Sequence, residues 1–393
     1  MHLAIDASNI RQGGGITHLS QLLCVVDPFN AGISQVTIWA SRATLAQLPS
    51  KPWLKKISPA WTEAGLLKRI LGQQILLRRE MSRSGCNALF SPGGTLPFLL
   101  KIPAVTMSQN MLPFEPLEAI RFGRWSWMRL KMWLLRRAQV RSFQSASGVI
   151  FLTEYARKVV AKWVSSLEEK SVIVPHGIER RFSMEPRQQK LASELSLHEP
   201  LTILYVSILM PYKHQIEVAR AISELRQRGF PIQARFLGSD WGRYGKQLKK
   251  TLQSLDPASE YLVWPGGVPY ADLHHEYAAA DMFVFASSCE NLPNILIEAM
   301  AAGLPIACSD RGPMQEVLGN SGIYFDPENP GSIAQALIAL IENVTLREQL
   351  AQSAWMASQK YSWERCARET FAFIAAITSQ HSEKNNRKMS ENV

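Results

Sequence analysis

The chain has 393 residues, a formal net charge of +10 and 46% hydrophobic residues. This composition excludes a disordered chain, and the length accommodates two domains of ordinary size. No apolar run is long enough to span a bilayer, and we expect no signal peptide at Met1. The five scattered cysteines fit neither zinc ligation nor a disulfide framework, so we expect a reducing, cytoplasmic compartment. The positive charge favours an acidic partner, namely a membrane surface, a nucleotide or a nucleic acid.

The N-terminal part alternates short apolar runs with helical segments. Strands are expected over residues 3–6, 36–40, 88–91, 103–107, 148–151 and 171–174. After the first strand, Gly13, Gly14 and Gly15 precede an apolar helix, where glycines let the backbone approach a ligand at the helix N-terminus. A plain tight turn is the alternative. The loop lacks the Gly-x-Gly-x-x-Gly pattern, so it does not predict a nicotinamide-binding fold.

Two segments of this part combine basic and apolar residues. The first is a helix expected from Leu66 to Arg83. The second has no acidic residue between Glu118 and Glu154, and its Arg, Lys and Trp residues suggest a face that contacts an anionic membrane. These residues are Arg121, Arg124, Trp125, Trp127, Arg129, Lys131, Trp133, Arg136 and Arg137. A partly buried helix whose Arg stems reach outward is the alternative, and nucleic-acid binding is not expected.

The C-terminal part shows the same alternation. Strands are expected over residues 201–207, 233–238, 261–265, 282–285 and 306–308, and helices over 332–358 and 362–379. The charged, turn-rich residues 179–200 are the expected linker, and residues 380–393 an expected mobile polar tail.

The most informative stretch runs from Ala286 to Pro305. A buried strand leads through Glu290 into a helix that begins near Pro293, carries Glu298 and is ended by Gly303. The carboxyl end of a parallel strand is where ligands bind in such sheets, and a helix N-terminus suits a diphosphate. Carboxylates accept hydrogen bonds from hydroxyls, so Glu298 is expected to bind ribose and Glu290 a donor sugar. A helix that merely carries two acids is the alternative.

This stretch resembles the Glu-x7-Glu motif of the retaining glycosyltransferases of family 4, which have the GT-B fold. The similarity continues through Ser309-Asp310-Arg311-Gly312, Glu316-Val317 and Gly322 to Pro327, and ends near Trp363. It covers roughly residues 200–375 and is patchier before. The resemblance implies two Rossmann-like domains with a cleft between them. It places the acceptor-side domain at 1–178, the nucleotide-sugar domain at 201–361, and a helix crossing back to the first domain at 362–379.

The resemblance also implies site residues. Gln109 stands where many members have a His, and it cannot carry a proton at neutral pH. Lys213 matches the Lys of a phosphate-binding pair, but Ser207 and Ile208 replace the preceding Gly and Arg. We therefore predict catalytic roles for Glu290, Lys213 and Gln109. His176 resembles a linker position and is expected to be structural. The predicted donor-binding residues are Glu298, Asn291, Leu292, Pro293, Asn294, Gly15, Gly14, Ser207, Gly238 and Val268.

The expected reaction is transfer of a hexosyl group from a nucleotide sugar to a glycan or lipid-linked acceptor, with retention of configuration. No Asp-x-Asp pair occurs, so we expect neither a metal nor another cofactor. The family and the Trp/Arg stretch suggest surface polysaccharide biosynthesis of the O-antigen or lipopolysaccharide type, in the cytoplasm and peripherally on the inner face of the membrane. A nucleotide-sugar epimerase and a non-catalytic transferase-like partner protein are the alternatives.

Overall fold

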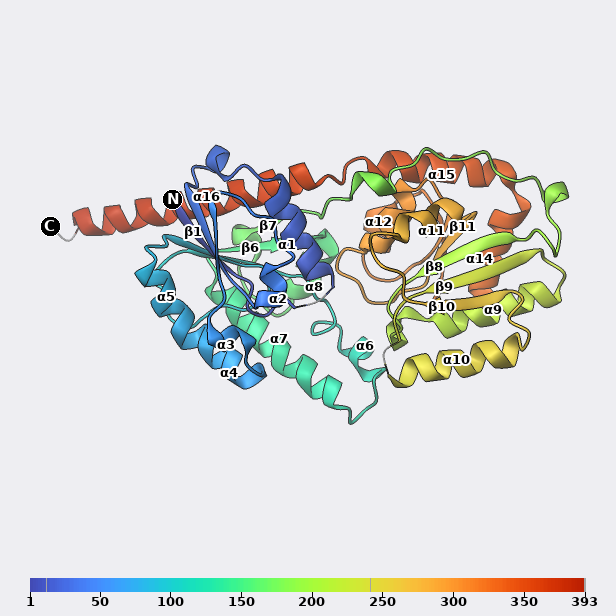
Figure 1. The fold of residues 1–393 in the computed structure, drawn as a ribbon, viewed down its shortest axis with the longest axis horizontal. Coiled ribbons are helices and arrows are strands. Elements are labelled where there is room, and N and C mark those ends of the chain that lie inside the picture. Colours follow the sequence, from blue (N-terminus) through green and yellow to red (C-terminus); the bar gives the residue numbers. More distant parts are fainter. Residues whose placement is uncertain (12, 241, 392–393) are drawn as a thin grey trace. The chain divides into compact units, whose positions relative to one another are not determined.

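The computed structural model describes residues 1–11, 13–240 and 242–391 and divides into two compact units (Figure 1). Unit 1 comprises residues 1–114, 130–177 and 362–393, and unit 2 comprises residues 115–129 and 178–361. The expected division placed 115–129 in the first domain and treated 179–200 as a separate linker. In the structure both segments belong to unit 2. The expectation was based on the resemblance and on the charged, turn-rich composition of residues 179–200, and neither shows where a segment packs.

Unit 1 is built on a parallel sheet that has seven strands within the described residues, in the order β3-β2-β1-β4-β5-β6-β7. The strands are β1 (His2–Asp6), β2 (Gln35–Trp39), β3 (Leu54–Ile57), β4 (Ala88–Ser91), β5 (Ala104–Met107), β6 (Gly148–Phe151) and β7 (Ser171–Ile173). The apolar runs of the central strands β1, β4, β5 and β6 are buried as parallel strands require, whereas the edge strand β7 is half-buried. The predicted strands of this part are confirmed. Strand β3 was not predicted, because Lys55 and Lys56 interrupt its apolar pattern at the sheet edge.

Helices surround this sheet. They are α1 (Gly14–Val25), η1 (Pro28–Ala31), α2 (Arg42–Leu45), α3 (Ala60–Glu63), α4 (Leu66–Leu71), η2 (Gly72–Leu76), α5 (Leu77–Arg83), α7 (Trp127–Ser145), α8 (Glu154–Ala161), η3 (Glu168–Lys170) and α16 (Trp363–Glu391). The predicted helix 66–83 is continuous but contains the π-helical turn η2, where a side chain on Gly72 would collide with Trp61. Although it lies at the other end of the chain, α16 packs beside α1 (Figure 1).

Unit 2 contains a second parallel sheet, with six strands among the described residues in the order β10-β9-β8-β11-β12-β13. The strands are β8 (Leu201–Val206), β9 (Ile232–Leu237), β10 (Leu262–Gly266), β11 (Met282–Phe285), β12 (Ile306–Ser309) and β13 (Ile323–Phe325). Two parallel-sheet, Rossmann-like units confirm the predicted α/β fold class.

The helices of unit 2 are α6 (Pro116–Ile120), η4 (Arg180–Phe182), η5 (Ala192–Glu194), η6 (Pro211–Lys213), α9 (Gln215–Gln227), α10 (Arg243–Leu255), α11 (Leu273–Ala279), α12 (Asn294–Ala301), α13 (Met314–Leu318), α14 (Pro330–Glu342) and α15 (Val344–Ser358). The expected polar tail from residue 380 is instead helical up to Glu391, because α16 continues; residues 392 and 393 lie outside the described part. Among the described helices, none has the length and apolar character needed to cross a bilayer.

Candidate functional site

The carboxyl edge of the unit 2 sheet collects most of the predicted donor-site residues. Strand β8 pairs with β9 on one side and β11 on the other, so the strand order changes direction at β8. Ligands of open parallel sheets bind at the carboxyl ends beside such a switch point. Lys213 lies in the connection that follows β8, and Glu290 lies in the connection that follows β11. The topology therefore places these two predicted catalytic residues at the switch point.

Lys213 and Glu290 form a direct ion pair through Nζ and Oε1. Only 6% of the Lys213 side chain and 16% of the Glu290 side chain is exposed. The ammonium also lies 5.5 Å from the ring centroid of Phe285 and 5.4 Å from that of Tyr212. A cation in so dry an environment attracts an anion more strongly than a solvated lysine would. The pair thus places one positive and one negative group side by side, where a ligand could contact both.

Helix α12 begins directly after this pair. Pro293 is its N-cap and Asn294 its first residue, so the free N–H groups and the positive dipole end lie close in sequence to Glu290. The Oδ1 atom of Asn294 is buried and has no hydrogen-bond partner among the described residues. Gly303 follows the helix with φ of +65°, which confirms the predicted helix stop. The helix start therefore has donors and one acceptor available for a ligand.

Glu298 lies within α12 and is 4% exposed. Its Oε2 accepts a hydrogen bond from the Tyr277 hydroxyl at 3.0 Å, and its Oε1 accepts one from the Tyr270 hydroxyl at 3.4 Å. Burial raises the pKa of the Glu298 carboxyl to about 8, although both tyrosine hydrogen bonds act to lower it. At neutral pH the group is therefore mostly protonated. Its predicted role as a ribose ligand remains a prediction.

The other predicted donor-site residues of unit 2 lie at the same sheet edge. Ser207 and Gly238 directly follow β8 and β9 and lie in contact, since a side chain on Gly238 would fall 1.7 Å from the Ser207 carbonyl oxygen. Only glycine fits at this position. Val268 lies two residues after β10, next to Gly267, which approaches Ser239. Ile208 is exposed and adds no charge where the family pattern has an arginine.

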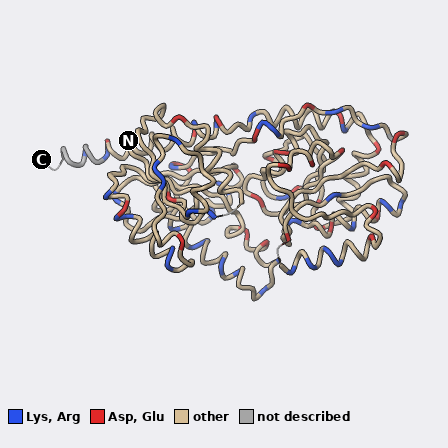
Figure 2. The backbone as a smooth tube through the Cα atoms, viewed as in Figure 1, with Lys and Arg blue, Asp and Glu red and all other residues tan. Residues whose placement is uncertain are grey.

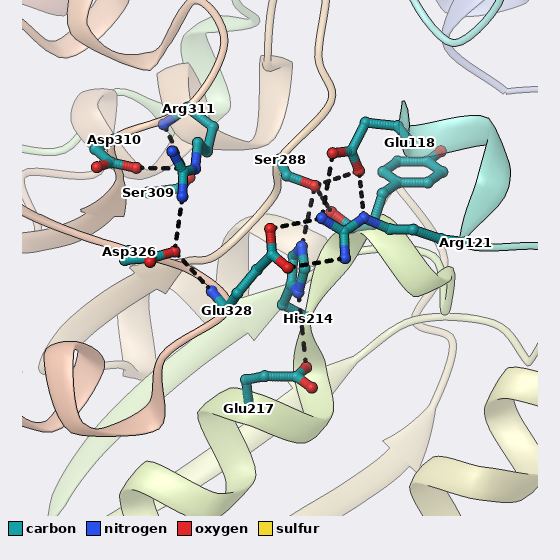
Figure 3. Close-up of polar contacts among 11 residues, drawn as sticks. Glu118, Arg121, His214, Glu217, Ser288, Ser309, Asp310, Arg311, Asp326 and Glu328 are labelled. Carbon is teal, nitrogen blue, oxygen red and sulfur yellow. Dashed lines mark hydrogen bonds and ion pairs between the residues drawn. The ribbon is translucent and has the colours of Figure 1, made fainter. Parts of the chain in front are cut away.

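A polar network that the sequence did not predict joins the segment 115–129 to this edge (Figure 3). The Ser288 hydroxyl donates to Oε2 of Glu118 at 2.6 Å and lies 3.0 Å from Nε2 of His214. Arg121 forms ion pairs with both Glu118 and Glu328, each at 2.7 Å. Ser288 is two residues before Glu290, and His214 directly follows Lys213. The network therefore braces both connections that carry the Lys213–Glu290 pair.

His214 is neutral at physiological pH. Burial, together with the positive charge of Arg121, lowers its pKa to about 4. Neither this residue nor Glu118 had a sequence signal for the role, since partners 74 to 170 residues apart leave no local pattern.

In unit 1, the carboxyl edge of the sheet brings together the glycine loop and Gln109. Helix α1 begins at Gly14, and a side chain on Gly15 would lie 3.3 Å from Oε1 of Gln109. The Gln109 amide nitrogen lies 3.1 Å from Nδ1 of His18, which is fully buried and has a pKa lowered to about 4 by burial. Gln109 and His18 thus form a neutral pair beside the glycine loop.

A second polar cluster at this edge was missed from the sequence. Gln73 donates to Oδ2 of the buried Asp6 at 2.5 Å, and Arg69 donates to Oδ1 of Asn9 at 3.1 Å. Burial raises the pKa of Asp6, while burial and the nearby charge of Arg11 lower the pKa of Arg69. The position of Asp6 at the carboxyl end of the first strand was the one feature of the sequence that could have predicted this cluster. These groups offer hydroxyl-binding and anion-binding contacts on the side predicted to receive the acceptor.

One buried cluster has donor atoms suited to a metal. Atoms of His18, His176 and Cys366 lie within 4.8 Å of one another. The rings of His18, His176 and Trp363 pack together with centroids 4.5 to 5.8 Å apart. Burial raises the pKa of the Cys366 thiol to about 12 and lowers that of His176. Structural zinc takes four ligands, and this group supplies three in a site that favours a neutral thiol. We therefore assign it to core packing, as predicted for His176.

The basic stretch of residues 121–137 does not present a uniform face. Arg121 is paired within the network above, so it is not part of an exposed basic surface. Trp125 and Trp127 are 96% and 72% exposed, whereas Arg137 stacks on Trp133 at 4.5 Å and Arg136 on Trp163 at 4.1 Å. Exposed indole rings beside cations are typical of interfacial surfaces.

Known glycosyltransferases are similar to this chain in sequence. Residues 186–355 match the family model described as Glycosyl transferases group 1. Spore coat protein SA of Bacillus subtilis is 28% identical over 242 residues, which is 57% of this chain and 63% of that protein. O-antigen chain mannosyltransferase B of Escherichia coli is 32% identical over 105 residues, 27% of this chain and 28% of that protein. The chain therefore spans less than two thirds of either relative.

Longer matches extend into unit 1. A GDP-mannose-dependent alpha-(1-6)-phosphatidylinositol monomannoside mannosyltransferase of Mycolicibacterium smegmatis is 26% identical over 294 residues, 71% of each chain. The solved sucrose-phosphate synthase of Thermosynechococcus elongatus superimposes with a TM-score of 0.72 at 15% identity, covering 100% of both chains, which shows the fold alone. Residues 186–355 therefore match a glycosyl transferases group 1 domain, carried on a chain with the two-unit fold of GT-B glycosyltransferases.

Proposed function

We propose that the protein is a retaining glycosyltransferase that moves a hexosyl group from a nucleotide sugar to a glycan or lipid-linked acceptor. The observation that carries this proposal is the Lys213–Glu290 pair at the sheet switch point, directly before the start of helix α12. A diphosphate needs the cation and the helix amides, and a sugar needs the carboxylate. The relatives named above as mannosyltransferases support the same class of donor and reaction.

In the proposed mechanism, the donor diphosphate takes the Lys213 ammonium as its partner and Glu290 turns to the hydroxyls of the donor sugar. The bond between the anomeric carbon and the diphosphate oxygen breaks first. The acceptor hydroxyl oxygen then forms a bond to that carbon on the same face, and its proton passes to the departing phosphate oxygen. Lys213 and the α12 amides stabilise the charge that develops on the leaving group. Gln109 lies at the acceptor side as a neutral hydrogen-bonding group.

The proposal includes no metal, because the lysine and the helix start supply the positive charge. It places the reaction in surface polysaccharide biosynthesis in the cytoplasm, at the inner face of the membrane. The contact with the membrane is made by the stretch Arg124, Trp125, Trp127, Arg129, Lys131, Trp133, Arg136 and Arg137. The exposed indole rings of this stretch and the phosphatidylinositol-linked acceptor named for one relative support this part of the proposal.

A thermal-shift screen of nucleotide sugars tests donor binding, since a ligand bound only by the folded state raises the Tm. We expect at least one nucleotide sugar to raise the Tm of the wild-type protein, with or without EDTA. The double variant Lys213→Met/Glu290→Leu removes both charges without leaving one buried alone, so it should fold but show no shift. The matched control Arg228→Met/Glu224→Leu removes an exposed pair of the same unit and should respond like the wild type.

Several results would contradict the proposal. An equal shift in the Lys213→Met/Glu290→Leu variant would remove the site assignment, and a shift that needs Mg²⁺ would remove metal independence. No shift with any nucleotide sugar would favour the non-catalytic partner protein. An epimer formed from the donor alone would favour the epimerase, and inversion in the product's NMR coupling constants would exclude retention.

A further inference from the structure

Unit 1 has a groove of about 750 Å³ that the proposed reaction does not use. It lies between helix α5 and the residues that lead into strand β5. The cationic residues that line it are Arg78, Arg79, Arg83 and Lys101, and no acidic residue is among the lining residues that the structure describes. Four positive charges around one groove repel each other, so an anion bound there would be stabilising.

Among the residues that the structure describes, no acidic side chain competes for these four cations. Within the described part of the chain, none of them lies in ion-pair distance of an acidic side chain. The acid of the same helix, Glu80, accepts a hydrogen bond from Trp61 at 3.2 Å and does not line the groove. Basic residues recur along α5 and α7 in Figure 2. The positive charge of the groove is therefore available to a ligand.

Apolar side chains project beside these cations. Leu99 is 82% exposed and holds a left-handed backbone conformation with φ of +52°, which a leucine adopts only at an energetic cost. Phe98 is also exposed, and Arg141 stacks on its ring at 3.5 Å. The helical run before the groove exposes further apolar residues, namely Leu66, Leu67, Ile70, Leu71, Ile75 and Leu76. Such a concentration of exposed apolar side chains marks an interaction surface.

The groove lies away from the residues assigned to the reaction. Its lining residues Gly85 to Asn87 directly precede β4, and its lining residues Leu99 to Ile102 precede β5. These positions are the amino ends of two neighbouring parallel strands. The glycine loop and Gln109 follow the carboxyl ends of strands in the same sheet. The groove therefore occupies the opposite edge of the unit 1 sheet.

We propose that this groove binds the phosphate headgroup of an anionic phospholipid while Leu99, Ile75 and their apolar neighbours insert into the interfacial layer of the bilayer. Cations that contact headgroups beside aliphatic side chains that contact acyl chains are the complement of such a surface. A single-stranded nucleic acid fits less well, because it requires aromatic rings open for base stacking. Here the rim is aliphatic, and Arg141 already stacks on Phe98. The proposal rests on the membrane contact proposed above and adds to it a headgroup site on unit 1 that shares no residue with the stretch 124–137.

The test is flotation of the full chain with vesicles of phosphatidylcholine alone or of phosphatidylcholine mixed with phosphatidylglycerol. We expect binding to the mixed vesicles only. Each cation near an anionic surface contributes about 1 kcal/mol, so Arg79→Ala/Arg83→Ala/Lys101→Ala should weaken the partition constant roughly a hundredfold. The charge-matched control Lys158→Ala/Lys162→Ala/Lys250→Ala changes exposed lysines outside the groove and should bind far better than the groove variant.

A second variant separates the apolar contact from folding. Leu99→Gly removes the side chain at a position whose backbone already favours glycine, so the Tm should stay the same or rise while the partition constant falls. Equal binding to both vesicle types, equal losses in the groove and control variants, or unchanged binding by Leu99→Gly would each overturn the proposal. Binding to a single-stranded RNA that matches binding to the mixed vesicles would also overturn it. The Tm shift that a nucleotide sugar causes, measured on the same variants, tests donor binding separately from vesicle binding.

Discussion

Burial of Glu298 makes the stability of the protein depend on pH. An acid whose pKa is raised by folding holds its proton more tightly in the folded state than in the unfolded chain. Between the ordinary pKa of 4.5 and the folded value of about 8, the free energy of unfolding therefore falls as the pH rises. The slope from this group is about 1.4 kcal/mol per pH unit in that range, and the loss is complete above pH 8. Below pH 4.5 the carboxyl is protonated in both the folded and the unfolded chain, so its contribution to stability is fully present and no longer changes with pH.

The variant Glu298→Gln tests this directly, because the amide keeps the shape and cannot ionise. We expect it to be more stable than the wild type at pH 8 and similar at pH 5, as measured by urea denaturation at both values. Glu224→Gln is the control, since Glu224 is exposed and forms an ion pair with Arg228 at 3.6 Å. A stability difference between Glu298→Gln and the wild type that does not change with pH would show that the carboxyl is ionised throughout.

The family resemblance implied which side chains gather at the unit 2 edge, but it did not imply their partners. Lys213 and Glu290 meet because β8 and β11 are neighbours in the sheet, which the family pattern implied. The burial of Glu298 against Tyr277 was not predictable, because it depends on how α11 packs and not on any local pattern. Long-range partners such as Glu118 and Ser288 were missed for the same reason.

At the scale of elements, the segment 115–129 is held on unit 2 by polar contacts. Arg121 donates to both carboxylate oxygens of Glu328, at 2.7 and 3.2 Å, while the two side chains are 26% and 49% exposed. Exposed pairs contribute little, but a two-point arginine–carboxylate contact is at the upper end of their range. The segment is therefore anchored more firmly than its short helix α6 suggests.

A double-mutant cycle on Arg121→Ala and Glu328→Ala measures this anchor. We expect a coupling free energy of about 0.5–1 kcal/mol in unfolding experiments, falling in high salt because the pair is partly exposed. The pair Arg228–Glu224, which is exposed and separated by 3.6 Å at the C-terminal end of helix α9, should give about half as much. Coupling energies that are equal for the two pairs, or zero for both, would mean that the network does not hold the segment.

Elements were predicted well where the hydrophobic pattern was strong and poorly where packing decides. Buried strands such as β11 and β12 were found because an uninterrupted apolar run leaves few alternatives. The π-helical turn η2 was not, since it depends on Trp61 packing against Gly72. The predicted end of the last helix at residue 379 was also wrong, since α16 continues to Glu391; the predicted mobility of the tail stays a prediction.

For the whole molecule, the last segment of the chain completes the first unit. The backbone of Trp363 packs against Gly177, since a side chain on the glycine would lie 2.1 Å from the backbone nitrogen of Trp363. The ring of Phe373 packs against Gly148 in the same way. The buried residues of α16 are therefore part of the unit 1 core although they are encoded after unit 2. The order of elements could be predicted from the sequence, but this membership was implied only by the resemblance.

The assignment of α16 to unit 1 predicts which strands lose protection from hydrogen exchange when a core residue of α16 is mutated. Phe371 is 1% exposed, and its replacement by Ala should cost about 3–5 kcal/mol. Because α16 contacts β4 and β6, hydrogen exchange should accelerate in those strands while β8 and β11 keep their protection. The matched variant Phe283→Ala, in the core of unit 2, should show the reverse pattern. If each variant accelerated exchange equally in both sheets, the two units would unfold as one cooperative body and stability could not be assigned to either.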